Sequence, residues 1–379
     1  MNSSEDRAFI TKLRTRQRRR QLFLALLIFV FAFGWWWTGS DEGRWSESEA
    51  RAWYAEQEPI VGVNYVPSNR VNTTDWWQSP VDEELVAREL GWAADLGFNA
   101  VRVFLQFIVW QDDPEALLES FEQFVSIADA QGLRVVPVLF DDCAFGEPKQ
   151  LDPYLGPQRP SQPHVLLSSW TPSPGERIRK DLAYQPQLRR YVAEVVGRYR
   201  QDSRILFWDL YNEPGHNGGL EYSAELLRLA WTEARRQQPL QPITVAVWDH
   251  WDEEVEGFND YLFAASDILS IHLYGDLEFL QEKLIPLKES SNRPIIVTEW
   301  MGRWSGSEPV RDLAWMMEAG IGSFAWGLVS GDTQGRYPWW SDADEPTDPD
   351  FWHHDFLHRD GRPFNPEETE GIRELLTNP

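Results

Sequence analysis

Between residues 60 and 326 the chain alternates between short apolar, β-branched runs and longer amphipathic stretches. The short runs are typical of buried strands, and the longer stretches are typical of helices that cover a sheet. Eight such strands predict a parallel sheet closed into a (β/α)8 TIM barrel. The expected strands are Ile60–Tyr65, Ala100–Phe104, Arg134–Phe140, Ile205–Leu210, Ile243–Val247, Ile268–Tyr274, Ile295–Glu299 and Gly322–Trp326. The expected helices are Asp82–Leu96, Pro114–Gln131, Gln185–Arg200, Ser223–Gln237, Leu277–Lys288, Pro309–Ala319, Pro366–Leu376 and a weaker one between Glu253 and Ala265.

A doubly wound open sheet is the structural alternative, but no glycine-rich phosphate turn follows the first strand. The length of 379 residues fits one barrel domain, expected over residues 58–379, because such barrels run to about 250 residues or more as one unit. Two insertions, 141–183 and 327–364, follow the third and eighth strands and are rich in Pro, Trp and Asp. Both are expected on the face where a barrel keeps its active site.

The N-terminus has the pattern of a membrane anchor. Residues 1–20 form a basic tail, residues 21–38 are uncharged and mostly apolar, and residues 39–57 are expected to form a polar stalk. Basic residues before a span stay in the cytoplasm, so the barrel is expected outside it, in the periplasm or at the cell surface. A cleavable signal peptide is the alternative, but no small-residue cleavage site follows the apolar run. The single cysteine, Cys143, excludes an internal disulfide.

Charge narrows the possible partners. The net charge is −25, and because residues 1–20 carry seven basic and two acidic side chains, the remainder sums to −30. Such an acidic body repels nucleic acid, so a polynucleotide substrate is excluded. The 21 tryptophans give weak support to carbohydrate binding, since indole faces stack on sugar rings.

Two glutamates stand where predicted strands end. Glu213 lies in Trp-Asp-Leu-Tyr-Asn-Glu-Pro, and Glu299 lies in Pro-Ile-Ile-Val-Thr-Glu-Trp. Two carboxylates at the ends of different strands could act as the acid/base and the nucleophile in the cleavage of a glycosidic bond. The alternative that both are ordinary surface acids fits poorly with Asn-Glu-Pro placed directly after a strand.

Further motifs fall in order on the predicted strands. Arg102 lies on the second, His272 and Tyr274 on the sixth, and Trp326 on the eighth. With the two glutamates, they make the chain resemble a clan A glycoside hydrolase, closest to glycoside hydrolase family five, the cellulase family. The resemblance covers residues 58–376.

The resemblance implies a role for each position. Glu299 is expected to be the nucleophile of a retaining mechanism, supported by Arg102 and the Tyr274 hydroxyl. Glu213 is expected to be the acid/base and to need a raised pKa. Its neighbour Asn212 is expected to bind the sugar 2-hydroxyl. His272 is then expected beside the acid/base, and Trp326 beneath the attacked sugar.

The end of the third strand departs from the family pattern, which commonly has His or Asn there. Here Asp141 or Asp142 is the candidate for that sugar-contacting position, so substrate preference cannot be carried over from cellulases. The insertion after the eighth strand is expected to wall one end of the cleft, which favours a short or exo-type substrate. Candidate platforms on this insertion are Trp339, Trp340 and Trp352.

No cofactor or metal is expected. His353, His354 and Asp355 resemble metal ligands, but no further ligand follows at a recognised spacing. Two alternative functions remain: a transglycosylase that uses the same covalent intermediate, and a non-catalytic carbohydrate-binding protein of the cell envelope. The sugar and its linkage stay open.

Overall fold

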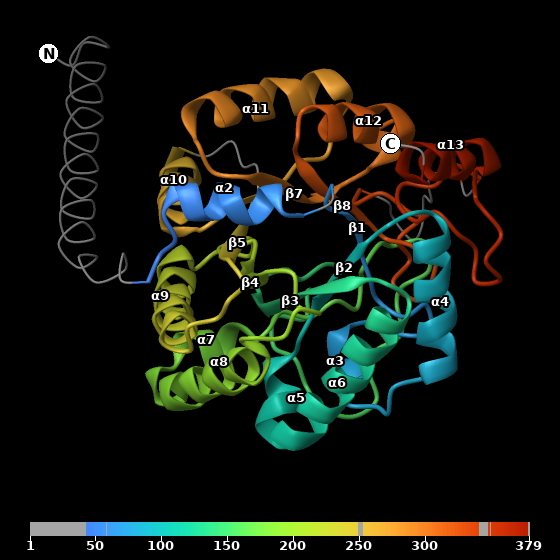
Figure 1. Ribbon diagram of the computed structural model, residues 1–379. Coiled ribbons are helices and arrows are strands. Elements are labelled where there is room, and N and C mark those ends of the chain that lie inside the picture. Colours follow the sequence, from blue (N-terminus) through green and yellow to red (C-terminus); the bar gives the residue numbers. More distant parts are fainter. Residues whose placement is uncertain (1–42, 58, 249–252, 341–347, 349, 378–379) are drawn as a thin grey trace, which may run out of the picture. The chain divides into compact units, whose positions relative to one another are not determined.

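The computed structural model describes residues 43–57, 59–248, 253–340, 348 and 350–377. Eight parallel strands form a closed barrel in which each pairs with the next and β1 pairs with β8. The TIM-barrel prediction is therefore confirmed, and helices surround the strands (Figure 1). The strands are β1 (Val61–Asn64), β2 (Ala100–Phe104), β3 (Arg134–Asp141), β4 (Trp208–Asn212), β5 (Ile243–Trp248), β6 (Leu269–His272), β7 (Ile295–Trp300) and β8 (Gly322–Trp326).

Eight predicted helices are present, with ends that differ by at most a few residues. Several begin at an acidic cap: Asp82, Asp113 and Asp276 each accept a hydrogen bond from a backbone N–H of the first turn. They are α4 (Glu83–Asp95), α6 (Pro114–Ala130), α8 (Gln185–Tyr199), α9 (Leu220–Arg236), α10 (Glu253–Ala265), α11 (Leu277–Ser290), α12 (Pro309–Glu318) and α13 (Pro366–Thr377).

Four short helices were not predicted, because each is too short to show a helical period: α2 (Glu47–Ala55), α3 (Thr73–Trp77), α5 (Phe107–Asp112) and α7 (Glu176–Lys180). The first of them corrects the expected stalk over residues 39–57. Ser46 and Glu49 form a capping box that starts α2, and the compact unit begins at Arg44.

Helix α2 packs against the N-terminal end of the barrel. Ala50 is fully buried there, and Trp45, Trp53 and Tyr54 pack against the same apolar cluster. The cluster contains Ile60, Ala100, Val136, Leu206, Phe207, Ile268, Ile296 and Phe324. This end of the barrel is therefore an apolar, closed core, which leaves the opposite end for polar chemistry.

The basic tail 1–20 and the apolar segment 21–38 lie outside the described residues. Within the described residues, none of the helices combines the length and apolar character needed to cross a bilayer.

The two long insertions meet over the C-terminal end of the barrel. The Leu167 N–H donates to the Thr333 carbonyl at 2.8 Å, and the His164 and Tyr337 rings lie 5.1 Å apart. The first insertion is also joined to β3, since Asp141 and Ser173 exchange backbone hydrogen bonds of 2.8 and 2.9 Å. Segments far apart in sequence thus form one wall on the face where the strands end.

Candidate active site

A cavity of about 480 Å³ opens where the strands end. Six residues expected at the site line it: Asn212, Glu213, His272, Tyr274, Glu299 and Trp326. Arg102 lies beneath them and is fully buried. The remaining lining is mostly aromatic and comprises Phe104, Cys143, Phe145, Leu167, Trp170, His216, Trp248, Phe279 and Trp339.

Irregular strand pairing near the cavity affects the direction of the candidate side chains. The pairing register shifts between Asp209 and Asn212, between Ile271 and His272, and between Val297 and Trp300. Bulges of this kind redirect side chains next to active sites. Glu213 itself has a φ of 46°, in the left-handed region that costs a residue with a Cβ about 1–3 kcal/mol. The backbone is thus least regular where the candidate residues stand.

Glu299 is held by two donors. Arg102 Nη1 donates to its Oε1 at 2.8 Å, and the Tyr274 hydroxyl donates to its Oε2 at 2.8 Å. Burial raises the pKa of Glu299 and the Glu213 carboxylate adds to this, whereas His272, Arg102 and Tyr274 favour the ionised form. The contacts therefore stabilise a carboxylate that burial alone would protonate.

Arg102 connects four strands. Besides Glu299 on β7, it donates to Asn64 on β1 at 2.8 Å, to Asp209 on β4 at 2.8 Å and to Asn212 on β4 at 2.7 Å. Burial lowers its pKa, but the carboxylates of Asp209 and Glu299 outweigh that, so the pKa of Arg102 is raised. It remains a fixed cation beneath the cavity.

Glu213 has different partners. Its Oε1 lies 2.6 Å from His272 Nδ1, and its Oε2 accepts from the Cys143 thiol at 3.0 Å and lies 3.6 Å from His216 Nε2. Burial raises its pKa, but the hydrogen bond from His272, the nearby His216 and the Cys143 thiol lower the pKa to about 2. This direction is opposite to the raised pKa that the sequence led us to expect for Glu213, because His272, His216 and Cys143 favour its charged form.

The two carboxylates are close together. One oxygen of Glu213, one of Glu299 and a ring nitrogen of His272 all lie within 4.8 Å of one another. In glycosidases, carboxyl groups about 5–5.5 Å apart go with retention and those about 6.5–9.5 Å apart with inversion. The closest oxygens of the pair, within 4.8 Å of each other, are compatible with the shorter of these two separations.

Asp141 and Asp142, one of which was expected to contact the sugar, are not among the residues that line the cavity. Asp141 Oδ1 accepts from the Cys143 N–H at 2.9 Å and from Asn212 Nδ2 at 2.9 Å, and its Oδ2 accepts from Trp170 Nε1 at 2.7 Å. Burial raises the pKa of Asp141 to about 7. Both acids turn inward because backbone and side-chain donors surround them, and the next residue, Cys143, reaches the cavity instead.

Asp142 supports the turn that follows β4. It accepts from the Tyr211 hydroxyl at 2.8 Å, the Gly215 N–H at 2.6 Å and the Ser223 hydroxyl at 2.6 Å, and it pairs with Arg179. This acid therefore fixes the segment that carries Glu213.

Trp326 belongs to an aromatic wall. Its ring lies 5.9 Å from Phe104 and 6.3 Å from Trp170, and this group packs with Leu166 and Leu167 of the first insertion. Among the candidate platforms, Trp339 lines the cavity, with its ring 4.6 Å from Tyr274. Trp340 is 56 % exposed outside the lining, and Trp352 is buried against Phe364.

Cys143 and His216 were missed as site residues. The signal for His216 was its position three residues after Glu213, within one turn, where its N–H donates to the Glu213 carbonyl at 3.0 Å. Cys143 had no signal, because nothing in a single sequence places a lone thiol beside a carboxylate.

No protein-family model and no curated protein matches the chain. Solved structures are similar to it. A GH5_18 enzyme from Streptomyces cattleya in complex with GlcNAc has 18 % identity and a TM-score of 0.57, covering 85 % of this chain and 82 % of that one. An exo-β-1,4-mannosidase from Opitutaceae bacterium strain TAV5 has 17 % identity and a TM-score of 0.56, covering 84 % and 59 %. The β-glucosidase from Pyrococcus furiosus has 12 % identity and a TM-score of 0.55, covering 85 % and 95 %. The chain thus has the fold of the family that its motifs resemble.

Proposed function

We propose that this chain is a retaining β-glycoside hydrolase of the family-five type, with Glu299 as nucleophile and Glu213 as acid/base. The observation that carries the proposal is the pair of buried carboxylates with oxygens within 4.8 Å, in a cavity at the C-terminal end of a (β/α)8 barrel. The fold shared with GH5 enzymes supports the same class.

In the first step Glu299 attacks the anomeric carbon and the glycosidic C–O bond breaks, leaving a glycosyl ester on Glu299. Arg102 and Tyr274 hold both oxygens of the nucleophile, so the attack costs little reorientation. Asn212 lies where its side-chain amide can meet the sugar 2-hydroxyl. Its Oδ1 accepts from Arg102, and its Nδ2 donates to Asp141 at 2.9 Å and to the Cys143 sulfur at 3.4 Å; the 2-hydroxyl would replace this second, weak contact.

The leaving oxygen takes its proton from the Glu213–His272 pair. Glu213 Oε1 and His272 Nδ1 lie 2.6 Å apart, so a proton carried by this pair is shared between the carboxyl group and the imidazole. As negative charge develops on the leaving oxygen, the proton passes through Glu213 to it. In the second step Glu213 takes a proton from water, which hydrolyses the ester with overall retention.

The cavity suits cleavage from a chain end. The wall of Phe104, Trp170 and Trp326, with Leu167 hydrogen-bonded to Thr333 across the two insertions, blocks one side of the site. We therefore propose exo action that releases a short sugar unit, with Trp339 as the platform on the open side. A β-mannoside is the first substrate to test, since one similar structure is titled an exo-β-1,4-mannosidase and a GH5_18 structure holds Manb1-4GlcNAc.

The test is a panel of aryl β-glycosides and oligosaccharides, assayed with the wild type and with Glu299→Gln. Turnover of at least one β-glycoside by the wild type alone, with a β-configured first product by NMR, supports the proposal. Turnover with an α-configured first product contradicts retention. Hydrolysis of no β-glycoside by folded protein would favour the binding-protein alternative. Added acceptor sugars show whether transfer competes with hydrolysis.

We also propose that residues 21–38 anchor the protein to the membrane, with the barrel outside the cytoplasm. The proposal is supported by the uncharged apolar run that follows seven basic residues. Fractionation followed by N-terminal sequencing tests it. Full-length protein in the soluble fraction would contradict the anchor, and a chain that begins near residue 40 would indicate a cleaved signal peptide.

A further inference from the structure

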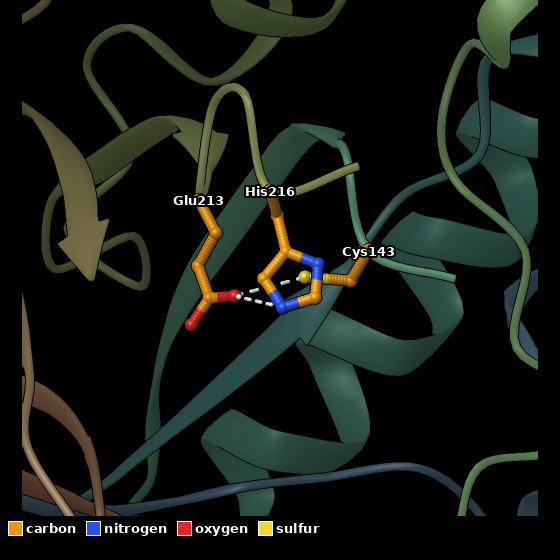
Figure 2. A group of neighbouring side chains, drawn as sticks. All are labelled: Cys143, Glu213 and His216. Atoms are coloured by element: carbon orange, nitrogen blue, oxygen red, sulfur yellow. Dashed lines mark hydrogen bonds and ion pairs between the residues drawn. The ribbon is translucent and has the colours of Figure 1, made fainter. Parts of the chain in front are cut away.

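Three groups with lone pairs converge on one side of the cavity. Glu213 Oε2 lies 3.0 Å from Cys143 Sγ and 3.6 Å from His216 Nε2, and all three atoms lie within 4.8 Å of one another. Figure 2 shows the thiol approaching from the segment after β3, and the carboxylate and imidazole from the turn after β4. All three residues line the cavity, so a small ion can reach them from solvent.

The three groups are held in place by the surrounding protein. Asp141 accepts from the Cys143 N–H at 2.9 Å, and Asp142 accepts from the Gly215 N–H of the turn at 2.6 Å. The His216 ring packs 4.7 Å from Trp248 and 5.6 Å from Phe145. Its other nitrogen, Nδ1, is buried and has no hydrogen-bond partner among the described residues. Asp142 also forms an ion pair with Arg179. The other carboxylate oxygen of Glu213, Oε1, contacts His272 Nδ1.

This geometry fits a zinc ion. Zinc binds sulfur at about 2.3 Å and nitrogen or oxygen at about 2.0–2.2 Å, so a tetrahedral site separates its ligand atoms by roughly 3.3–3.6 Å. The two separations from Glu213 Oε2, 3.0 Å to Cys143 Sγ and 3.6 Å to His216 Nε2, are within a few tenths of an ångström of these values, and the third pair, Cys143 Sγ and His216 Nε2, lies within 4.8 Å. A mixed thiolate, imidazole and carboxylate set selects zinc and its soft neighbours over magnesium or calcium, which take oxygen ligands.

We propose that Cys143, Glu213 and His216 form a zinc-binding site that switches the enzyme off by occupying the acid/base. On binding, a Zn–S bond forms and the thiol proton leaves to solvent, while Glu213 Oε2 and His216 Nε2 each donate a lone pair. The fourth position faces the cavity and takes water. With Oε2 on the metal, Glu213 no longer moves a proton to or from a substrate, and zinc competes with the sugar. The inhibitory consequence rests on the proposed function, whereas the site itself does not.

Metal binding tests the site without any substrate. Zinc affinity is measured on full-length protein that carries no affinity tag, by competition with a chromophoric chelator. Cobalt(II) is added in a parallel titration, because a thiolate ligand gives an intense charge-transfer band. We expect one zinc per chain, a cobalt–thiolate band and no binding of magnesium. Cys143→Ser and His216→Gln should each weaken zinc by at least about tenfold, the low end for loss of even an outer partner. The control is His358→Gln, which removes an imidazole outside this cavity and should bind zinc as the wild type does.

Wild-type protein that binds no zinc, or a cobalt complex without the thiolate band, overturns the site even if a variant fails to fold. If folded Cys143→Ser and folded His216→Gln both bind zinc as tightly as the wild type does, the site is also overturned. Zinc binding with the expected variant losses supports the site whether or not a glycoside is turned over. If a glycoside is hydrolysed, zinc should inhibit competitively, with an inhibition constant equal to the dissociation constant. Saturating zinc that leaves hydrolysis unchanged contradicts the proposed switch.

Discussion

The two glutamates share one cavity but have unlike surroundings. Glu299, at the end of β7, accepts from Arg102 and Tyr274, and neither partner exchanges protons near neutral pH. The pKa of Arg102 is raised by its carboxylate partners despite burial, and burial raises the pKa of Tyr274 well above its usual value. This half of the site therefore fixes the charge and position of one carboxylate.

Glu213, at the end of β4, is surrounded by two imidazoles and a thiol. His272 lies on one oxygen, and His216 and Cys143 lie near the other. A nucleophile needs a fixed charge, whereas an acid/base needs a proton that moves within hydrogen-bond distance. His272 Nδ1 also lies 3.5 Å from Glu299 Oε2, but Arg102 donates to Glu299 and not to Glu213. The contrast supports the proposed roles, and four substitutions test it.

Glu299→Gln should have the largest effect. Among the described residues that line the cavity, the other carboxylate is Glu213, which is held by His272. We therefore expect kcat/KM to fall by about 10⁴-fold or more on every substrate, as for loss of a nucleophile in other hydrolases. Steady-state kinetics on aryl and sugar leaving groups measures this, with thermal unfolding as the check on folding. Substantial residual activity on any leaving group would mean that Glu299 is not the nucleophile.

Glu213→Ala should come next, and its cost should depend on the leaving group. Loss of a general acid costs about 10²–10⁴-fold when the leaving oxygen needs protonation, and less for an activated aryl oxide. Azide should restore turnover and give a β-glycosyl azide, because it fits the space of the lost carboxylate and needs no base. An equal loss on all leaving groups without azide recovery would show that the two roles are exchanged.

Tyr274→Phe removes one donor from Glu299 and should cost roughly 10- to 100-fold in kcat/KM, as for a hydrogen bond to a charged group. Tyr274 favours the ionised form, so its loss raises the Glu299 pKa further. The enzyme is active above that pKa, and the acid limb of the kcat/KM profile should therefore move to higher pH. Tyr65→Phe is the matched control, since its hydroxyl donates to Glu89 at the same 2.8 Å away from the site. An acid limb that stays in place in Tyr274→Phe contradicts the contact.

Cys143→Ala should have the smallest effect. The thiol is one of the weaker influences on the pKa of Glu213, and because a thiol is a weak donor its hydrogen bond to the carboxylate should contribute about 0.5–1.5 kcal/mol, or roughly 2- to 12-fold. Removing this donor raises the Glu213 pKa, so the limb on which activity is lost as Glu213 loses its proton should move to higher pH. A pH–rate profile measures the shift. A shift of the acid limb instead would mean that the Cys143 thiol acts on Glu299 rather than on Glu213.

The barrel could be predicted from the sequence because strands buried on both faces read as continuous apolar runs between amphipathic helices. Boundaries were less certain. The fourth strand was expected from Ile205, but Ile205 makes only an isolated bridge with Val135, and regular pairing starts at Trp208. Helix α2 was missed because its nine residues are too few to show a helical period, and only a few of its side chains pack on the barrel.

The glutamates, Arg102 and Tyr274 could be predicted because each stands at a fixed place relative to a strand end. Asp141 and Asp142 could not, since the direction of a side chain just after a strand depends on the donors that later segments bring. Ser173 and Trp170 come from the same insertion, and Gly215 comes from the next strand's turn. The low pKa of Glu213 likewise depends on a contact between β4 and β6.

The central claim is that Glu299 forms the bond to the sugar while Glu213 handles the proton. A 2-deoxy-2-fluoro aryl β-glycoside of the preferred sugar slows hydrolysis of the glycosyl ester, so that the ester can be trapped. Intact mass and peptide mapping then locate it. The account predicts one sugar per chain, attached to Glu299, and its disappearance in Glu299→Gln. A sugar attached to Glu213, or turnover with inversion and no trapped ester, would contradict it.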